Sequence, residues 1–228
     1  SILNILGLAV GIAACLFILQ YVSYEKSYDR FHSSYEDIYR VRYKVIRDGE
    51  VNIDCAAAVP RVGPFMKENM PEVIECARAY PMSSTVTYNN TSFLEERIHI
   101  VDPSFLSIFS FPLIKGDPNT ALSEPYSVVI TEAISKKYFG NEDPIGKSIR
   151  RGNNEDYTVT GVFEDIPVNS HLKFDIVLSQ RSLHSLMGID RAENDFNVFH
   201  SYTFFKLMPG TDLDDLRDKF PDFVDKYV

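Results

Sequence analysis

The sequence predicts an α+β domain that follows an N-terminal transmembrane helix. The chain has 228 residues and 24% of them are charged, yet the first 24 residues carry no charge at all. Beyond them, short stretches of alternating hydrophobicity, typical of strands, are mixed with short helical patterns. No repeat of fixed period and no low-complexity linker divides this part into independent domains. We therefore expect one mixed α/β unit outside the membrane.

The composition excludes several classes of protein. The net charge is -9 and no cluster of Lys and Arg is present, so nucleic-acid binding, which needs a basic surface, is not expected. Three cysteines, 11 glycines and 13% aromatic residues exclude a disulfide scaffold, a collagen and a disordered chain.

Residues 1–24 are predicted to form a transmembrane helix. An uncharged helix of this length spans about 36 Å, and the hydrocarbon core of a bilayer is about 30 Å thick. The alternative is a signal peptide, and Ile12-Ala13-Ala14-Cys15 resembles a lipoprotein cleavage site. The apolar stretch continues past Cys15, however, whereas the apolar part of a signal peptide is shorter. Because the chain starts without Met, we expect a fragment that begins at or inside this helix, whose orientation cannot be read from flanking charges.

Three small residues on this helix form a candidate packing face. Gly7 and Gly11 make a Gly-x-x-x-Gly pattern and Ala14 lies one turn further on. Small residues at this spacing let two helices approach closely in lipid. Since glycine and alanine are also common in membrane helices, a role in packing stays an open alternative.

Residues 25–38 continue the helical pattern in amphipathic form and predict a stalk helix. Residues 39–55 alternate around Asp48-Gly49, which predicts a β-hairpin. Helical spacing between two prolines predicts a helix over 59–70, and a helix is also expected between Thr131, as N-cap, and Gly140. The last helix is expected to open at Thr211, with Asp214 completing a capping box. Further strands are expected at 73–80, 83–88, 92–101, 127–131, 157–163, 174–178 and 202–207, with short helices after Asp102 and at 181–187.

The sequence does not predict catalytic chemistry, a cofactor or a metal site. Residues 140–148 resemble a phosphate-binding loop, but the spacer has one residue too many and it includes two carboxylates and Pro144. We interpret this stretch as a helix C-cap followed by a turn. The five histidines lack metal-ligand spacing, and adjacent carboxylates cannot face each other as an acid and base must. No catalytic, cofactor-binding or metal-binding residue is therefore assigned, and the chain is not expected to be an enzyme. Cys55 and Cys76 are interpreted as free thiols, with a disulfide as the alternative.

Four stretches of the chain together resemble a known family. The first is Asn4–Gly11 with Ser27–His32, and the second is Phe111–Asp117 with Ala121-Leu122. The third is Ser127–Glu132 with Lys137–Gly140 and Asp143–Lys147, and the fourth is Tyr157–Phe163 with Ile166-Pro167 and Asn169–Leu172. In this order they are similar to the periplasmic core domain of MacB-like and FtsX-like ABC transporter permeases. The resemblance covers nearly the whole chain.

The resemblance implies a two-lobed domain between the first two membrane helices, with one lobe inserted in a discontinuous membrane-proximal lobe. We expect the transmembrane helix at 1–24, the stalk at 25–38, the first part of the membrane-proximal lobe at 39–101, the inserted lobe at 102–200, and the return strand and helix at 201–228. It also implies a bacterial inner-membrane location with residues after about 25 in the periplasm. The implied partners are a cytoplasmic ABC ATPase, a second permease copy or paired permease, and a periplasmic adaptor.

These expectations imply a permease that couples ATP hydrolysis elsewhere to export or other work on the outer face of the membrane. Two readings from other classes compete with it. A membrane-anchored extracytoplasmic sensor domain would share the single helix and mixed fold. An anchored hydrolase would need a catalytic constellation that the sequence does not display.

Overall fold

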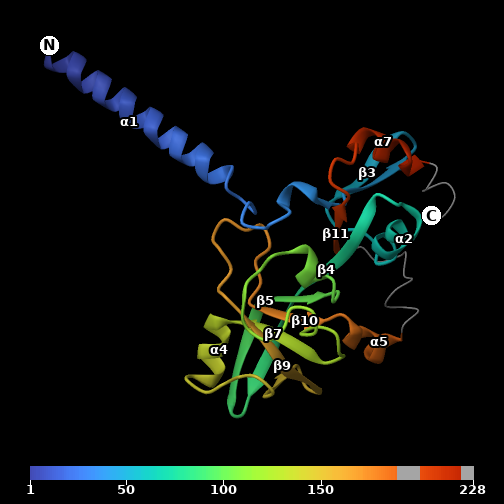
Figure 1. The fold of residues 1–228 in the computed structure, drawn as a ribbon. Coiled ribbons are helices and arrows are strands. Elements are labelled where there is room, and N and C mark those ends of the chain that lie inside the picture. Colours follow the sequence, from blue (N-terminus) through green and yellow to red (C-terminus); the bar gives the residue numbers. More distant parts are fainter. Residues whose placement is uncertain (189–200, 222–228) are drawn as a thin grey trace.

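The structure, a computed structural model, describes residues 1–188 and 201–221, and places an isolated helix beside a mixed α/β domain (Figure 1). The domain has two lobes that share one long strand, β4. The helices are α1 (Ile2–Glu25), η1 (Tyr35–Asp37, a 3-10 helix), α2 (Val62–Asn69), α3 (Phe105–Ile108), α4 (Glu132–Phe139), α5 (Arg181–Met187) and α7 (Leu213–Asp218). The strands are β1 (Ile38–Arg40), β2 (Tyr43–Arg47), β3 (Glu50–Cys55), β4 (Val73–Tyr88), β5 (Thr91–Val101), β6 (Leu113–Lys115), β7 (Ser127–Thr131), β8 (Ser148–Arg151), β9 (Glu155–Phe163), β10 (Ile176–Ser179) and β11 (Tyr202–Leu207).

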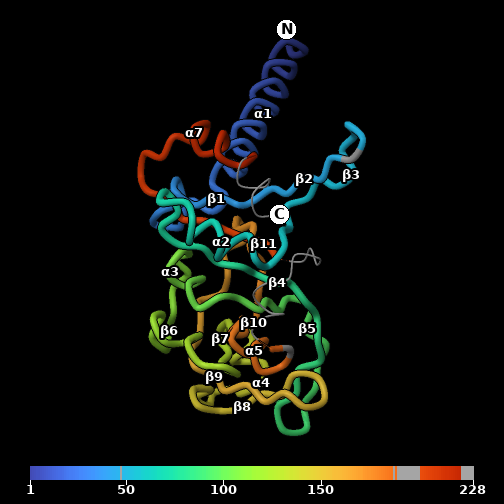
Figure 2. Tube along the Cα trace, turned by 90° about the vertical axis from the view of Figure 1, so that its right-hand side faces the viewer, coloured from blue at the N-terminus to red at the C-terminus, as the bar shows by residue number. Residues whose placement is uncertain are grey.

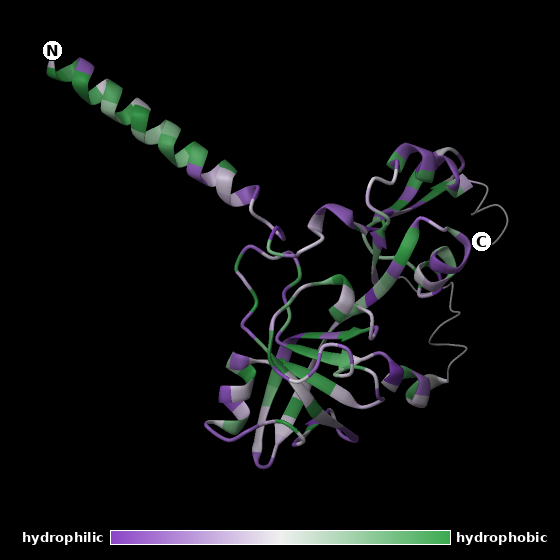
Figure 3. Cartoon of the chain, viewed as in Figure 1, coloured by the Kyte–Doolittle hydropathy of each residue, from purple (hydrophilic) through white to green (hydrophobic). Residues whose placement is uncertain are grey.

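Helix α1 is apolar along most of its length, as Figure 3 shows, and none of its residues is buried against the domain. Its 24 residues are long and apolar enough to cross a membrane. An apolar surface of this extent is unfavourable in water and favourable in hydrocarbon. The helix predicted over residues 1–24 is therefore confirmed, and its length and composition suit a bilayer.

The amphipathic stalk helix predicted over residues 25–38 is not formed. Helix α1 ends at Glu25, turns follow, and only the three residues of η1 are helical again. Asp29 has a φ of 56°, in the left-handed region where a right-handed helix cannot continue. Its backbone N–H donates to the Asn169 carbonyl oxygen at 3.0 Å instead of to the preceding turn. A contact with a distant loop thus overrides the local helical pattern.

The main sheet has nine strands, and β4 holds it together. The order is β1-β11-β4-β5-β10-β7-β9-β6, and β8 pairs with both β4 and β9. Along β4, residues 73–79 pair with β11 on one side and residues 79–88 pair with β5 on the other. The two lobes are therefore two ends of one staggered sheet, and Ala79 lies where the pairing passes from one lobe to the other.

The second lobe, here called the barrel lobe, is a closed ring of six strands. The pairings run from β4 through β5, β10, β7, β9 and β8 back to β4. Its core consists of apolar side chains from these strands and from α4, including Ile98, Ile130, Tyr138 and Tyr157. Ring closure removes the unpaired strand edges that an open sheet would expose.

The first lobe, here called the α2 lobe, contains β1 to β3, α2, the first half of β4, β11 and α7. Its core joins α2 to β4, β11 and α7 through residues such as Met66, Phe205 and Leu216. A further cluster, rich in phenylalanine, includes Phe105 and Phe204 and connects α3 with strands of both lobes. The β2–β3 hairpin projects from this lobe (Figure 2).

The lobe boundary predicted between residues 101 and 102 does not coincide with a break in the sheet. Strand β5 ends at Val101 and pairs with β10, which lies in the segment assigned to the inserted lobe. The second half of β4 and all of β5 therefore belong to the barrel lobe. The prediction failed because a parallel pairing between strands 78 residues apart leaves no local signal.

Most of the predicted elements are confirmed and a few need correction. The hairpin turns at Asp48 and Gly49, both with positive φ, and Thr131 and Gly140 cap α4 as expected. Strand β4 runs unbroken through residues 73–88, although two strands were expected. Helix α7 is capped by Asp212, whose side chain accepts two backbone N–H bonds, and not by Thr211. Parts of the predicted inserted lobe (189–200) and return helix (222–228) lie outside the described residues.

Candidate functional site: two junctions

Two junctions hold the parts of the molecule together. The helix junction consists of residues 27–33, which follow α1, with residues 109–111 and 169–171 of the domain. The lobe junction consists of Pro60, Arg78, Asp102 and Ser104, where the two lobes meet. The helix junction brings together parts of three of the four stretches that carry the family resemblance.

Asn169 fastens the end of α1 to the domain. Its side-chain Nδ2 donates to the Ser27 carbonyl oxygen at 3.0 Å and lies 3.1 Å from Ser27 Oγ. The Ser27 hydroxyl in turn donates to the Tyr24 carbonyl oxygen in the last turn of α1, at 2.6 Å. These bonds satisfy groups that a helix end otherwise leaves unpaired, and they fix the direction in which the chain leaves α1.

Asp29 is the centre of the polar contacts of this junction. Its Oδ1 accepts from the Ser170 hydroxyl at 3.1 Å and from the His171 backbone N–H at 3.0 Å. Its Oδ2 lies 2.6 Å from His171 Nδ1. The Asp29 side chain is 33% exposed and that of His171 is 68% exposed, so water screens this pair. Asp29 thus binds the domain through several bonds, each of modest strength.

His32 forms the buried part of the helix junction and is only 2% exposed. Its Nδ1 accepts the Ser110 backbone N–H at 3.1 Å, and its ring packs against Phe31, Phe109 and Phe111. Burial among these rings lowers the pKa of His32, with a smaller opposing effect from Asp29. The imidazole is therefore neutral at pH 7, and its proton is on Nε2 because Nδ1 accepts the Ser110 N–H.

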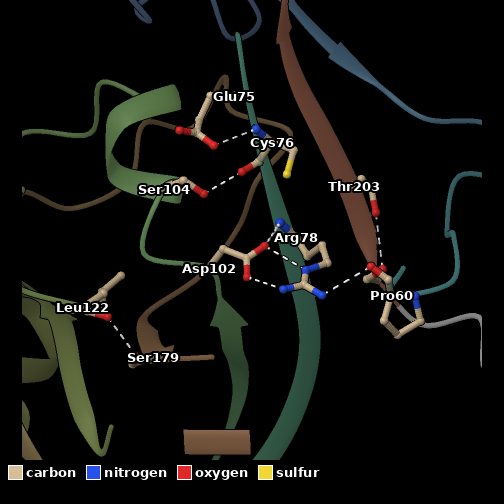
Figure 4. A network of polar contacts seen from close by, with 10 residues as sticks. Pro60, Glu75, Cys76, Arg78, Asp102, Ser104, Leu122, Ser179 and Thr203 are labelled. Atoms are coloured by element: carbon tan, nitrogen blue, oxygen red, sulfur yellow. Dashed lines mark hydrogen bonds and ion pairs between the residues drawn. The ribbon is translucent and has the colours of Figure 1, made fainter. Parts of the chain in front are cut away.

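The lobe junction is a buried ion pair with additional hydrogen bonds (Figure 4). Arg78 binds Asp102 in bidentate fashion, through Nε to Oδ2 at 2.8 Å and Nη2 to Oδ1 at 2.7 Å. The Arg78 backbone N–H also donates to Asp102 Oδ2, and Arg78 Nη1 donates to the Pro60 carbonyl oxygen before α2. The Ser104 hydroxyl donates to the Cys76 carbonyl oxygen at 2.5 Å. Strand β4, α2 and the start of α3 are thereby joined.

The predicted packing face lies on α1, away from both junctions. A Cβ atom added at Gly7 or Gly11 would meet no atom within 4 Å. No residue of α1 is buried, and Ala14 is therefore exposed as well. The domain therefore leaves this face open, and the packing role of Gly7, Gly11 and Ala14 stays a prediction.

The loop that resembles a phosphate-binding motif is a structural turn. Gly140 ends α4, Lys147 pairs with Glu142, and Lys115 pairs with Asp143 at 2.9 Å. The Gly146 N–H donates to the Val159 carbonyl oxygen and so is not directed at a ligand. The charges of this loop neutralise each other within the barrel lobe.

Within residues 1–188 and 201–221, no group of three or more His, Cys, Asp or Glu side chains could hold a metal ion. Cys15, Cys55 and Cys76 are free, as interpreted from the sequence. Burial raises the pKa of the Cys76 thiol to about 12, so this residue is a protonated thiol at neutral pH.

The functional contacts that sequence reasoning missed are all long-range. Asp29 and His171 are 142 residues apart, and Arg78 and Asp102 are 24 residues apart. The signal that could have found the first pair was present, since both residues lie in stretches that carry the family resemblance. Arg78 has no such signal, because it lies within a run of otherwise apolar strand residues.

Comparisons with known proteins agree on the family of this chain. The profile of the MacB-like periplasmic core domain matches residues 1–223. The chain belongs to this family. Its members are parts of ABC transporter permeases, and the fold described above is that of a MacB-like periplasmic domain with an N-terminal apolar helix.

Solved structures share this fold. A domain from Porphyromonas gingivalis, of a protein described as a permease, has a TM-score of 0.73 at 23% identity and covers 86% of this chain and 84% of its own. The periplasmic region of MacB from Actinobacillus actinomycetemcomitans has a TM-score of 0.59 at 12% identity, with 83% of each chain covered. The extracellular domain of the noncanonic ABC-type transporter YknZ from Gram-positive bacteria has a TM-score of 0.55 at 16% identity, covering 79% of this chain and 87% of its own. No curated protein matches the chain.

Proposed function

We propose that this chain is the first membrane helix and periplasmic part of an ABC permease, and that it transmits movement driven by a cytoplasmic ATPase to the outer face of the membrane. The observation that carries the proposal is the helix junction. Movement of α1 is transmitted only if α1 is fastened to the domain, and Asp29 and Asn169 fasten it. A sensor domain is a weaker candidate, because the family match is to a permease domain.

In this proposal the chain carries out no chemistry and holds no cofactor. The periplasmic domain lies outside the inner membrane, and the permease works as a homodimer or beside a paired permease, with a periplasmic adaptor as a further partner. The face of α1 that carries Gly7 and Gly11 is open, which supports the packing of a second membrane helix against it.

The test is to follow movement across the helix junction in the full-length permease with its copurified ATPase. Hydrogen–deuterium exchange is measured with and without ATP and vanadate, which traps the nucleotide. We expect nucleotide to change exchange in residues 27–34 and in residues 102–110 and 169–173. In an Asp29→Ala, Asn169→Ala variant, nucleotide should still change exchange in residues 27–34 but no longer in residues 102–110 and 169–173. The ATPase activity of this variant should be kept.

The matched control is Asp54→Ala, which removes an exposed carboxylate paired with Arg42 in the β2–β3 hairpin. It should behave as the unaltered protein. If the Asp29→Ala, Asn169→Ala variant shows the full nucleotide response in the domain, the junction does not transmit movement. If no ATPase copurifies with the full-length protein, the proposal as a whole fails.

A further inference from the structure

The end of α1 contains a hollow of about 490 Å³ that spans the change from apolar to polar side chains. It is lined by Leu19, Val22, Ser23, Lys26, Ser27 and Arg30. Leu19 and Val22 belong to the charge-free stretch, and Lys26 and Arg30 are the first two basic residues of the whole chain. If α1 lies in a bilayer, this hollow is at the level where hydrocarbon gives way to lipid headgroups.

The two cations of the hollow are not neutralised by the protein. In the described parts of the chain, neither Lys26 nor Arg30 forms an ion pair, although most other basic side chains do, among them Arg61 and Lys137. Asp29 lies between them in sequence, but its carboxylate is bound to Ser170 and His171. Both cations are exposed, and Arg30 packs 5.7 Å from the ring centre of Tyr35.

Electrostatics at this place favour an anion. The C-terminal end of a helix carries about half a negative charge, which alone would repel one. Two full positive charges on Lys26 and Arg30 outweigh this half charge together with the single negative charge of Glu25. The Ser23 hydroxyl adds a hydrogen-bond donor beside them, and Leu19 and Val22 offer an apolar wall on the membrane side. Guanidinium and ammonium groups are the side chains that bind phosphate oxygens best.

We propose that this hollow binds the phosphate group of an anionic phospholipid, with the acyl chains alongside Leu19 and Val22. A zwitterionic lipid fits less well, because its own ammonium group would meet the second cation of the pair. A lipid held here lies within a few residues of Ser27 and Asp29, so it fixes the depth of α1 next to the helix junction. The inference rests on the proposed membrane placement of α1.

The experiment uses the full-length protein in nanodiscs that contain a trace of lipid with a photoreactive headgroup. One arm uses phosphatidylglycerol and the other uses phosphatidylcholine, and labelling of the peptide that spans residues 23–30 is measured by mass spectrometry. Each basic residue near an anionic membrane surface favours binding by a factor of about five. We expect at least about fivefold more labelling by phosphatidylglycerol, and a loss of this preference in the Lys26→Gln, Arg30→Gln variant.

The matched control is Lys136→Gln, Arg150→Gln, which removes two exposed cations from the barrel lobe and should keep the full preference. Lys26→Arg should also keep it. Equal labelling by the two lipids, or an unchanged preference in the Lys26→Gln, Arg30→Gln variant, would overturn the lipid site. So would loss of labelling when excess inorganic phosphate is added, since that would indicate a general anion site.

A separate measurement distinguishes failure of the lipid site from failure of the membrane placement. The protein is washed with alkaline carbonate, which strips proteins that do not span the membrane. Retention with no lipid preference overturns the lipid site alone. Release from the membrane overturns both the lipid site and the placement of α1.

Discussion

Each junction pairs an aspartate with a nitrogen-bearing side chain, but the two pairs lie in different surroundings. At the lobe junction, the side chains of Arg78 and Asp102 are 3% and 10% exposed and bind each other in bidentate geometry. At the helix junction, Asp29 and His171 are 33% and 68% exposed, and their bond has a similar length. Distance therefore does not distinguish the two pairs, and exposure does.

Exposure decides how strongly each pair resists separation. Breaking a buried ion pair leaves an uncompensated charge in a medium of low dielectric, which costs about 3–5 kcal/mol. Breaking an exposed pair costs about 0–1 kcal/mol, because water solvates the separated charges. The lobe junction is thus suited to a permanent connection, and the exposed part of the helix junction to one that can open and close.

The largest effect is expected at the lobe junction. Asp102→Ala should lower the free energy of unfolding by about 3–5 kcal/mol, because the buried Arg78 guanidinium then loses the carboxylate that binds it in bidentate geometry. Urea unfolding of the protein in detergent micelles measures this. The Arg78→Met, Asp102→Leu variant replaces both charges with apolar side chains and should come within about 1–2 kcal/mol of the unaltered protein. If the two variants lose equal stability, buried charge is not the cause.

The next effect concerns pH at the helix junction. The pKa of His32 is lowered by burial, so below about pH 6.5 the unfolded chain binds a proton that the folded chain does not. Stability present above pH 6.5 should therefore be lost as the pH falls, by at most about 1.4 kcal/mol per pH unit. Unfolding at pH 7 and pH 5.5 measures the slope.

His32→Asn is the control for this slope, since its amide oxygen can accept the Ser110 N–H without titrating in this range. The variant should lose less stability between pH 7 and pH 5.5 than the unaltered protein. His99, whose pKa burial lowers to about 4, acts in the same direction in both proteins and cancels in the difference. If both proteins lost the same stability between pH 7 and pH 5.5, His32 would not contribute to the pH dependence.

Ser104→Ala tests a single neutral bond at the lobe junction. It removes the hydroxyl that donates to the Cys76 carbonyl oxygen, and we expect a loss of about 1 kcal/mol. Thermal unfolding followed by circular dichroism measures it. Ser107→Ala, which removes an exposed hydroxyl that donates to the Ser104 carbonyl oxygen, is the control and should cost less. If Ser107→Ala lowered the stability more than Ser104→Ala, the bond between Ser104 and β4 would not be important for the lobe junction.

Asp29→Asn tests the exposed part of the helix junction. Asparagine tolerates the positive φ at this position, and its Oδ1 can still accept from the Ser170 hydroxyl and the His171 N–H. Its Nδ2 is a donor, so the substitution removes both the charge and the acceptor that faces His171 Nδ1. The free energy of unfolding should fall by less than about 1 kcal/mol. Amide exchange in residues 169–172 should nevertheless become faster, and exchange around Arg78 should not change. A loss as large as that of Asp102→Ala would remove the difference between the junctions.

The smallest effect on the domain is expected from Gly7→Leu with Gly11→Leu. Both positions are open, so domain stability should stay within about 0.5 kcal/mol of the unaltered protein. Crosslinking between membrane helices of the assembled permease should fall, because larger side chains hold helices apart. Unchanged crosslinking would refute the packing role of this face.

Local features of the fold could be predicted from the sequence. The Asp48-Gly49 turn and the Thr131 and Gly140 caps depend on residues that are adjacent in the chain, and the structure confirms them. The cap of α7 was misplaced by one residue because Thr211 and Asp212 are both good N-caps. Only the structure shows that Asp212 Oδ1 accepts from the Asp214 and Asp215 N–H groups.

Features that depend on distant parts of the chain could not be predicted from pattern alone. The stalk helix was expected because its residues have helical spacing, yet Asp29 binds a loop 140 residues away and adopts a left-handed conformation. Closure of the barrel lobe through β8 likewise depends on pairings that no local signal encodes. Long-range contacts of this kind override local preference, and they are the contacts that build both junctions.

Strand β4 limits the ways in which the lobes can move. It is one continuous strand of 16 residues, about 53 Å long at 3.3 Å per residue, and each lobe is hydrogen-bonded to one half of it. Sliding or hinging the lobes apart would break rows of backbone hydrogen bonds. A twist of β4 along its length strains these bonds less, and the register shift between Met82 and Ser84 is a place where such twist can be absorbed. We therefore expect any movement between the lobes to be a twist of β4, limited by the Arg78–Asp102 pair that joins them.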